Sequence, residues 1–174
     1  TRSYTALIDA EGGLIAGLAD MALYDAGFAR QMRRRTLREA VAAADAVLCD
    51  ANMPAAALDM LAALAGNRPL HAIAISPAKA VRLTGLLPRL SCLFMNVREA
   101  RAIAGLAADA DAATAARALR EAGLACGIVT AGGAALTGFD AGGLFAVDPP
   151  SPRRIADETG AGDAVAGATV AHLM

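Results

Sequence analysis

The sequence predicts an α/β fold in which helices pack against a mostly parallel sheet. The 174 residues are 56% hydrophobic and only 19% charged, a composition typical of a chain with one sizeable buried core. Short runs recur that are continuously apolar, as strands buried on both faces are. These runs are 46–50, 71–76, 92–96 and 126–130. Helical stretches separate most of them, which favours crossover connections between parallel strands.

The first 24 residues predict a β-hairpin. Two short apolar runs, SYTALID and LIAGLAD, flank Glu11-Gly12-Gly13. A glycine turn between two such runs is typical of a hairpin. An exposed strand edge invites pairing with a second copy of the chain, so a homodimer formed through this hairpin is an expectation. We therefore divide the chain into a small β segment, 1–24, and an α/β core, 25–174.

Helices are predicted between the hairpin and the apolar runs. Residues 26–44 contain no proline and are basic and helical in pattern. Within them, the segment 30–38 (RQMRRRTLR) is interpreted as the solvated face of a helix, with a phosphate-binding patch as the alternative. Residues 54–65 form a packing helix that ends at Gly66.

A further helix is predicted over 111–122. Asp111 can cap its start and Gly123 can close its end. One side of this helix carries an apolar stripe, and the arginines lie away from it. The stripe consists of Ala112, Ala115, Ala116 and Leu119.

Each of the four apolar runs ends in a polar residue. The carboxyl ends of parallel strands meet at the same edge of an open sheet, where such folds bind ligands. We therefore expect a shared cleft at this edge. Its polar residues are Asp50, Ser76, Asn96 and Thr130.

The segment 155–170 (IADETGAGDAVAGATV) places an acid in the first turn of an almost entirely apolar helix. Gly160, Ala161 and Gly162 carry no bulky side chain, so the free N–H groups of the helix start can approach a phosphate. Asp163 gains from the positive end of the helix dipole and can serve as a base. The alternative is that Asp163 only stabilises the helix start.

Two other short segments are candidate parts of the same site. In Asn96-x-x-Glu99, an amide and a carboxylate three residues apart can position a hydrated Mg²⁺, with a plain first-turn acid as the alternative for Glu99. In Thr130-Ala131-Gly132-Gly133, a glycine turn can let the backbone approach a nucleotide. The alternative for this second segment is an ordinary hairpin turn.

Other functional classes are disfavoured by composition and spacing. A net charge of −1 and 3% aromatic residues argue against a nucleic-acid partner, and no apolar run is long enough to cross a membrane. The isolated histidines form no metal or triad pattern, and no G-x-G-x-x-G motif follows a first strand. Three scattered cysteines indicate core residues in a reducing compartment, so a cytoplasmic location is expected.

These motifs, in this order and spacing, resemble the C-terminal half of the PfkB (ribokinase-like) family of sugar and nucleoside kinases. The motifs are Asn96-x-x-Glu99, Thr130-x-Gly132 and Asp157-Glu158-Thr159-Gly160-Ala161-Gly162-Asp163. Within the family the chain is most similar to the pseudouridine kinase branch. SYTALIDAEGGLIAGLADM resembles its lid segment, LCDANMP its D-x-N-x-P turn, and ISPAKAVRL its S-x-x-K-A stretch.

The resemblance implies a three-layer αβα sandwich with a small β lid, of which 1–24 would be part. It implies ATP and Mg²⁺ as cofactors, with K⁺ as a further cation. Since family members are longer, the core 25–174 would be truncated at both ends. This chain has Ala135 and Val165 where the family commonly has Gly and Phe.

The resemblance also implies a role for each matching residue. Asp163 would be the base, and Gly160, Ala161 and Gly162 would form the anion hole. Asn96 and Glu99 would organise Mg²⁺ through water, and Thr130, Gly132 and Lys79 would contact the nucleotide. Asp157 and Thr159 would lie near a monovalent cation, and Asn52 would face the substrate.

The implied function is transfer of the γ-phosphoryl group of ATP to a hydroxyl of a small sugar or nucleoside, with pseudouridine favoured. Two alternatives stay open: a ribokinase-type sugar kinase, and a non-catalytic nucleotide-binding or oligomerising fragment of such a kinase.

Overall fold

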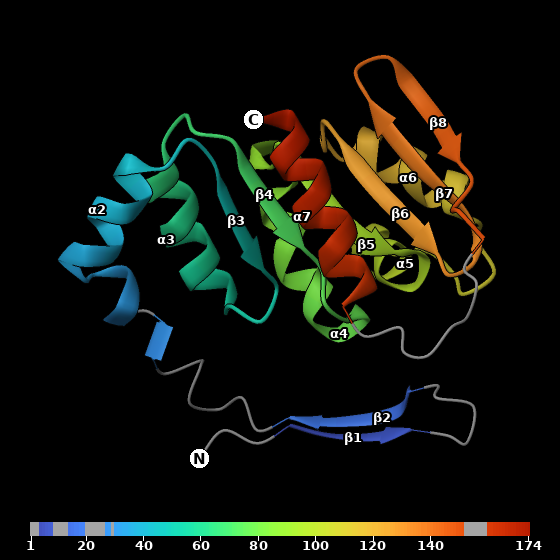
Figure 1. Ribbon diagram of the computed structural model, residues 1–174, viewed down its shortest axis with the longest axis horizontal. Coiled ribbons are helices and arrows are strands. Elements are labelled where there is room, and N and C mark those ends of the chain that lie inside the picture. Colours follow the sequence, from blue (N-terminus) through green and yellow to red (C-terminus); the bar gives the residue numbers. More distant parts are fainter. Residues whose placement is uncertain (1–3, 9–13, 20–26, 29, 152–159) are drawn as a thin grey trace.

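The computed structural model describes residues 4–8, 14–19, 27–28, 30–151 and 160–174. Six strands form the main sheet in the order β3-β4-β5-β6-β7-β8 (Figure 1). The first four run parallel, and the last two continue the sheet antiparallel. Their bounds are β3 Val47–Asp50, β4 Leu70–Ile73, β5 Cys92–Asn96, β6 Gly127–Ala131, β7 Ala134–Asp140 and β8 Gly143–Val147. The predicted α/β fold is confirmed.

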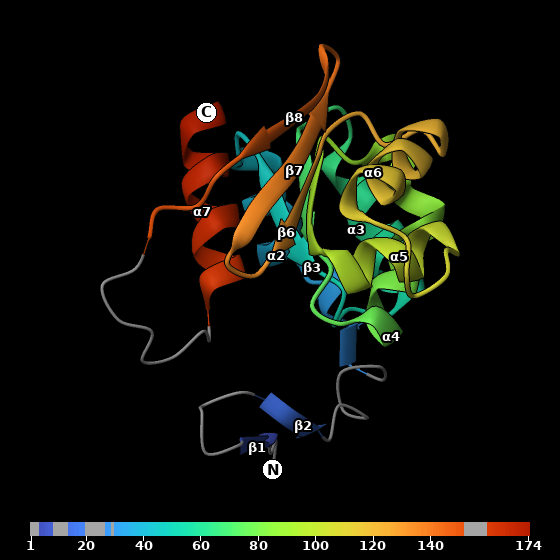
Figure 2. The same ribbon diagram turned by 90° about the vertical axis from the view of Figure 1, so that its right-hand side faces the viewer.

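Helices cover both faces of the sheet, which gives three layers (Figure 2). One face carries most of them, and α7 alone lies on the other face among the described elements. The helices are α2 Arg35–Ala43, α3 Ala55–Ala65, α4 Pro77–Ala80, the 3₁₀ helix η1 Val81–Arg89, α5 Val97–Ala104, α6 Ala112–Glu121 and α7 Ala161–Leu173. The larger core lies under α3 to α6, and a smaller one lies under α7.

The N-terminal hairpin is a separate two-stranded sheet. Strand β1, Tyr4–Ile8, pairs antiparallel with β2, Leu14–Ala19, and the register shifts between Leu7 and Ile8. The glycine turn predicted between the strands lies outside the described residues.

Several predicted helix ends are confirmed at the level of single contacts. The Asp111 side chain accepts a hydrogen bond from the backbone N–H of Thr114 at 2.7 Å and so caps α6. Gly66, with φ 58°, ends α3, because glycine adopts positive φ without a Cβ clash. Both caps act locally, which is why the sequence could indicate them.

The helix predicted over 26–44 is broken in the structure. Helical residues at 30–32 give way to an extended Arg34, and α2 begins at Arg35. Met32 and Val41 are both buried in the main core. Nine residues are about two and a half helical turns, so an unbroken helix would point these two side chains in opposite directions. The break allows both to reach the core.

The strand predicted over 71–76 is also shorter, because β4 ends at Ile73. Ile75 then adopts φ 70°, and the backbone N–H of Ser76 donates to the carbonyl of Ala74 at 2.9 Å. This tight turn is unusual for a β-branched residue, since positive φ crowds its side chain. It makes Ser76 the N-cap residue of α4 rather than the last residue of a strand.

His71 is a structural residue of the central sheet. Its side chain is 4% exposed, and Nδ1 has no hydrogen-bond partner among the described residues. Burial lowers the pKa of the His71 imidazole, because the charged form is poorly solvated there. A lowered pKa in the folded state contributes stability at neutral pH that is lost as the pH falls.

We expect His71→Leu to flatten the acid dependence of stability below about pH 6.5, the usual pKa of histidine. Urea midpoints at several pH values would measure this. His172→Leu, at an exposed position of α7, is the matched control and should keep the wild-type slope. An unchanged slope in His71→Leu would assign the acid sensitivity to other groups.

Candidate active site

The predicted polar residues gather at the carboxyl edge of the parallel strands. Asp50 ends β3, Asn96 ends β5, and Thr130 is the register partner of Asn96 on β6. Figure 1 shows that α7 also begins at this edge, and Figure 2 shows that it lies across the sheet from α4. Parallel strands bring their carboxyl ends together, so residues from distant parts of the chain meet here.

The start of α7 is open to solvent. Gly160 adopts φ 83°, and the helix begins at Ala161 with no side-chain cap. The first N–H groups of a helix have no partner within the helix, and here residues 160–164 are all exposed. A Cβ placed at Gly160 or Gly162 would meet no other atom of the described residues within 4 Å, so within that part of the chain no side chain crowds these amides. This geometry suits an anion.

Asp163 lies in the first turn of α7 and is exposed. The positive end of the helix dipole stabilises a carboxylate at this position. Asp157 and Thr159 lie outside the described residues, so the predicted cation site has no described geometry.

Asn96 and Glu99 form a reciprocal capping box at the start of α5. The Asn96 side chain accepts hydrogen bonds from the backbone N–H groups of Arg98 and Glu99, at 2.9 and 3.0 Å. In return, Glu99 Oε2 accepts from the backbone N–H of Asn96 at 2.8 Å. The structural alternative for Glu99, an acid in the first helical turn, is therefore realised, and the Mg²⁺ role stays a prediction.

The capping contact occupies only one carboxylate oxygen of Glu99. Burial raises the pKa of this carboxyl, because the side chain is only 6% exposed, while the Asn96 N–H opposes the rise. A raised pKa in the folded state favours stability at low pH, and this contribution is lost as the pH rises.

Glu99→Gln should therefore be more stable than the wild type near neutral pH in the absence of metal and nucleotide, because it removes the buried charge and keeps an acceptor for the Asn96 N–H. The difference should shrink toward about pH 4, the usual pKa of glutamate. Glu99→Ala should instead lose about 1 kcal/mol, since it removes the cap. Denaturant unfolding at pH 4 and pH 7 would measure both variants. If Glu99→Gln were less stable than the wild type at pH 7, the folded state would favour the ionised Glu99 carboxylate, and the expected penalty for burying this charge would be wrong.

Thr130 and Gly132 lie where β6 turns into β7. Gly132, with φ 63°, and Gly133 form a two-residue hairpin turn, and β6 and β7 pair antiparallel. The Thr130 hydroxyl donates to the carbonyl of Met95 at 3.4 Å, which ties the turn to β5. The alternative interpretation of this segment, an ordinary hairpin turn, therefore describes its backbone correctly. Both turn glycines are exposed, so the backbone stays accessible.

Lys79 and Asn52 meet at the same edge through a network that sequence patterns did not indicate. Lys79 Nζ donates to Asn52 Oδ1 at 2.6 Å, and Asn52 Nδ2 donates to Asp50 Oδ2 at 3.1 Å. Arg82 Nη1 donates to the carbonyl of Asn52 at 2.9 Å and holds the loop from the η1 side. No local signal could reveal Arg82, because it lies 30 residues from its acceptor.

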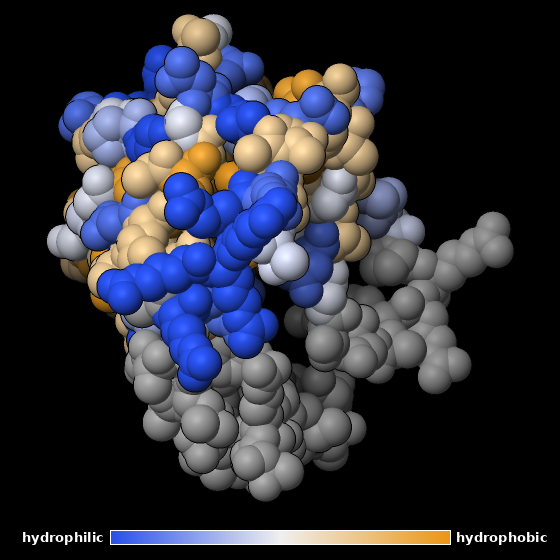
Figure 3. Space-filling view, turned by 90° about the vertical axis from the view of Figure 1, so that its left-hand side faces the viewer, coloured by the Kyte–Doolittle hydropathy of each residue, from blue (hydrophilic) through white to orange (hydrophobic). Residues whose placement is uncertain are grey.

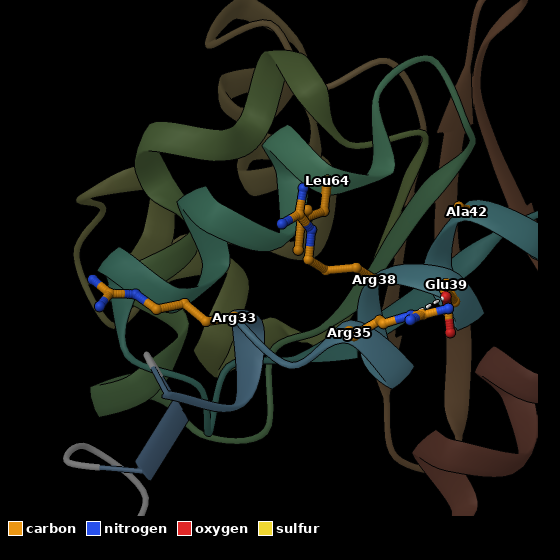
Figure 4. Close-up of a pocket in the computed structure, with 6 residues that line it drawn as sticks. All are labelled: Arg33, Arg35, Arg38, Glu39, Ala42 and Leu64. Carbon is orange, nitrogen blue, oxygen red and sulfur yellow. Dashed lines mark hydrogen bonds and ion pairs between the residues drawn. The ribbon is translucent and has the colours of Figure 1, made fainter.

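The arginine-rich segment lies away from this edge. A surface cavity of about 610 Å³ at α2 is lined by Arg33, Arg35, Arg38, Glu39, Ala42 and Leu64. Figure 3 shows a hydrophilic band on this side of the molecule, and in Figure 4 the three guanidinium groups point in different directions. Arg35 pairs with Glu39 at 2.7 Å. Diverging, exposed arginines fit a solvated face better than a phosphate site.

The described residues hold no cluster of three or more His, Cys, Asp or Glu side chains suited to a metal ion. Over the same part of the chain, no helix is long and apolar enough to cross a membrane.

The fold has three α/β layers. The open, glycine-flanked helix start and the acid at the carboxyl edge make an arrangement that suits an anionic ligand. The family model described as "pfkB family carbohydrate kinase" matches residues 12–174, and the chain belongs to this family. No curated protein matches the sequence significantly.

Solved structures support the same assignment. A carbohydrate kinase from Agrobacterium tumefaciens is 42% identical, with a TM-score of 0.79, over 99% of this chain and 55% of that chain. Two further structures share the fold at 18% identity: an adenosine kinase from Schistosoma mansoni, with a TM-score of 0.81, and a ribokinase from Thermotoga maritima, with a TM-score of 0.75. Each of these matches covers 99% of this chain and 56% of the other chain. The chain thus spans about half the length of these structures.

Proposed function

We propose that this chain carries the phosphoryl-transfer part of an ATP-dependent kinase that acts on a hydroxyl of a sugar or nucleoside in the cytoplasm, with pseudouridine the favoured acceptor. The observation that carries the proposal is the start of α7, where exposed backbone amides and Asp163 occupy the same helical turn at the carboxyl edge of the sheet. Membership of the carbohydrate kinase family supports it.

In this proposal, Asp163 accepts the proton of the acceptor hydroxyl. The hydroxyl oxygen then attacks the γ-phosphorus, and the bond between that phosphorus and the ADP oxygen breaks. The amides of Gly160, Ala161 and Gly162 stabilise the negative charge on the transferring group. Phosphoryl transfer requires mainly alignment and charge stabilisation, which a rigid helix start provides.

The other residues at the edge position the nucleotide. Thr130 and Gly132 border it on the β6–β7 turn, and Lys79 faces its phosphates. Asn52 holds Lys79 through the 2.6 Å hydrogen bond and faces the acceptor. Because the Lys79 ammonium has three donors, the contact with Asn52 leaves two for phosphate oxygens.

Asn96 and Glu99 would hold Mg²⁺ through water. Glu99 Oε2 accepts from the Asn96 N–H, so the second carboxylate oxygen is the acceptor that remains for a hydrogen bond from a metal-bound water. Oxygen donors of this kind suit Mg²⁺, which would neutralise charge on the phosphates. Asp157 and Thr159 are proposed to lie near K⁺.

The test is phosphoryl transfer by the protein as expressed from its gene, with ATP and Mg²⁺. Pseudouridine, uridine, adenosine and ribose are offered in parallel, and phosphorylated products are identified by mass spectrometry. Formation of a pseudouridine monophosphate at the highest rate is expected. Preferential phosphorylation of ribose would favour the ribokinase-type alternative, and no transfer to any acceptor would contradict the kinase proposal.

A second candidate function is nucleotide binding without catalysis. It is favoured by one observation: Gly132 and Gly133 are exposed in the β6–β7 turn, so the backbone is accessible to a nucleotide independently of Asp163. This candidate predicts a thermal shift with ATP and no phosphorylated product.

Light scattering of the same sample would test the proposed homodimer through the β1–β2 hairpin.

A further inference from the structure

Two cysteine thiols face each other across neighbouring parallel strands. Cys92 is the first residue of β5, and Cys126 immediately precedes β6. Leu93 and Gly127 are register partners, so the two cysteines lie side by side one position earlier. The Cys126 Sγ donates a hydrogen bond to Cys92 Sγ, and the two sulfur atoms are 3.2 Å apart.

The pair lies on the face of the sheet that α7 covers. Cys92 is fully buried in the small core with Phe94, Ala166 and Val170, and Cys126 is half-buried against the same cluster. Figures 1 and 2 place α7 alone on this face among the described elements. One thiol is therefore enclosed and the other is partly accessible.

The backbone geometry permits a covalent bond between the two sulfur atoms. Neighbouring strands lie about 4.8 Å apart. Disulfides usually join Cα atoms separated by about 4.4–6.8 Å. Both side chains point to the α7 face, so a bond would need a change in the side chains and little change in the strands.

We propose that Cys92 and Cys126 are a thiol pair that hydrogen peroxide oxidises to an intramolecular disulfide. This proposal does not depend on the proposed kinase function. It assigns a covalent modification site at the amino ends of β5 and β6, the opposite end of the sheet from Asp163.

Cys126 reacts first, because it is the accessible member. Its thiolate attacks one oxygen of the peroxide, the O–O bond breaks, and the released hydroxide takes up a proton to become water. Cys126 is then a sulfenic acid. The Cys92 sulfur attacks the Cys126 sulfur, and the hydroxyl group leaves with the Cys92 proton as a second water. Two thiols are oxidised by two electrons in total, and one hydrogen peroxide molecule is reduced.

The local hydrogen bond supports this order. The neighbouring Cys92 thiol lowers the pKa of the Cys126 thiol, because Cys92 can donate the hydrogen bond in the reverse direction once Cys126 is a thiolate. The same contact, together with burial, raises the pKa of the Cys92 thiol. The thiolate is the reactive form of cysteine. The accessible sulfur is thus also the more acidic one.

Cys49 provides an internal reference for the experiment. Its Sγ is buried on β3 and donates to the carbonyl of His71 at 3.5 Å. Burial raises the pKa of the Cys49 thiol to about 12, so its thiolate is scarce near neutral pH.

The experiment treats the protein with hydrogen peroxide, alkylates the remaining thiols under denaturing conditions and maps the tryptic peptides by mass spectrometry. The expected product is peptide 90–98 linked to peptide 121–153, with Cys49 alkylated. The link should disappear after treatment with a dithiol reductant. Full alkylation of all three cysteines, a link to Cys49 or a link between two chains would each overturn the proposal.

Variants then test whether the link depends on the contact between Cys92 and Cys126 or on the reactivity of any cysteine. Cys126→Ser should lose the link completely, and Cys49→Ser should form it at the wild-type rate. Because wild-type protein alone gives the peptide map, the test does not depend on the folding of a variant. Oxidation of Cys126 to a sulfinic acid without any link to Cys92 would also contradict the proposal.

Discussion

Asp163→Asn is expected to reduce turnover by about 10²–10⁴-fold, the usual contribution of a general base. The amide is nearly the same size as the carboxylate, but it cannot accept the proton of the acceptor hydroxyl at neutral pH. The α7 amides remain in place, so ATP binding should be nearly unchanged. Single-turnover kinetics measure the chemical step, and thermal shifts with ATP measure binding.

Asp109→Asn is the matched control. Asp109 is exposed, lies in the turn between α5 and α6, and undergoes the same chemical change. Its turnover should equal that of the wild type. Turnover by Asp163→Asn at the wild-type rate would exclude Asp163 as the base and leave it as a residue that only stabilises the helix start.

Phe139→Ala is expected to cost about 3–5 kcal/mol of folding free energy, as other buried Phe→Ala changes do. Phe139 on β7 is 0% exposed, and its ring lies over its register partner Gly127 on β6. A Cβ at Gly127 would lie 2.5 Å from the Cζ of this ring. Since typical domains are stable by only about 5–15 kcal/mol, denaturant unfolding should show a large loss.

Phe145 offers a matched control in the neighbouring strand pair. Its ring covers Gly138 in the same way, but its side chain is 43% exposed. Phe145→Ala should therefore cost about 1 kcal/mol, since much of its apolar surface is already in water. Equal losses for the two variants would show that burial of the ring does not govern the effect.

A glycine substitution tests the Gly127–Phe139 contact itself. Gly127→Ala should cost about 1–3 kcal/mol by overpacking against the buried ring. In a Phe139→Ala background the same change should cost much less, because the space is then free. Additive losses would contradict a direct contact.

Local physics explains which predictions the structure confirmed. Continuously apolar runs form β3, β5 and β6, each within a residue of its predicted range. Burial on both faces holds for most of β5 but not for the edge strand β3, where Leu48 is 43% exposed. The Asp111 cap and the Gly66 helix end depend on residues within one turn. Where packing with distant residues decides, prediction failed: the helix over 26–44 breaks so that both Met32 and Val41 reach the core.

The sequence by itself determined the α/β class, the family and the glycine–acid turn at the start of α7, because apolar runs, caps and motifs are properties of neighbouring residues. Only the tertiary structure decided that Lys79 meets Asn52, that Phe139 covers Gly127 and that Cys92 faces Cys126. These contacts depend on strand order and register. For the parallel strands β3 to β6, a register shift of one residue would reverse which face each strand residue occupies, and their register is set by packing between segments that are far apart in the sequence.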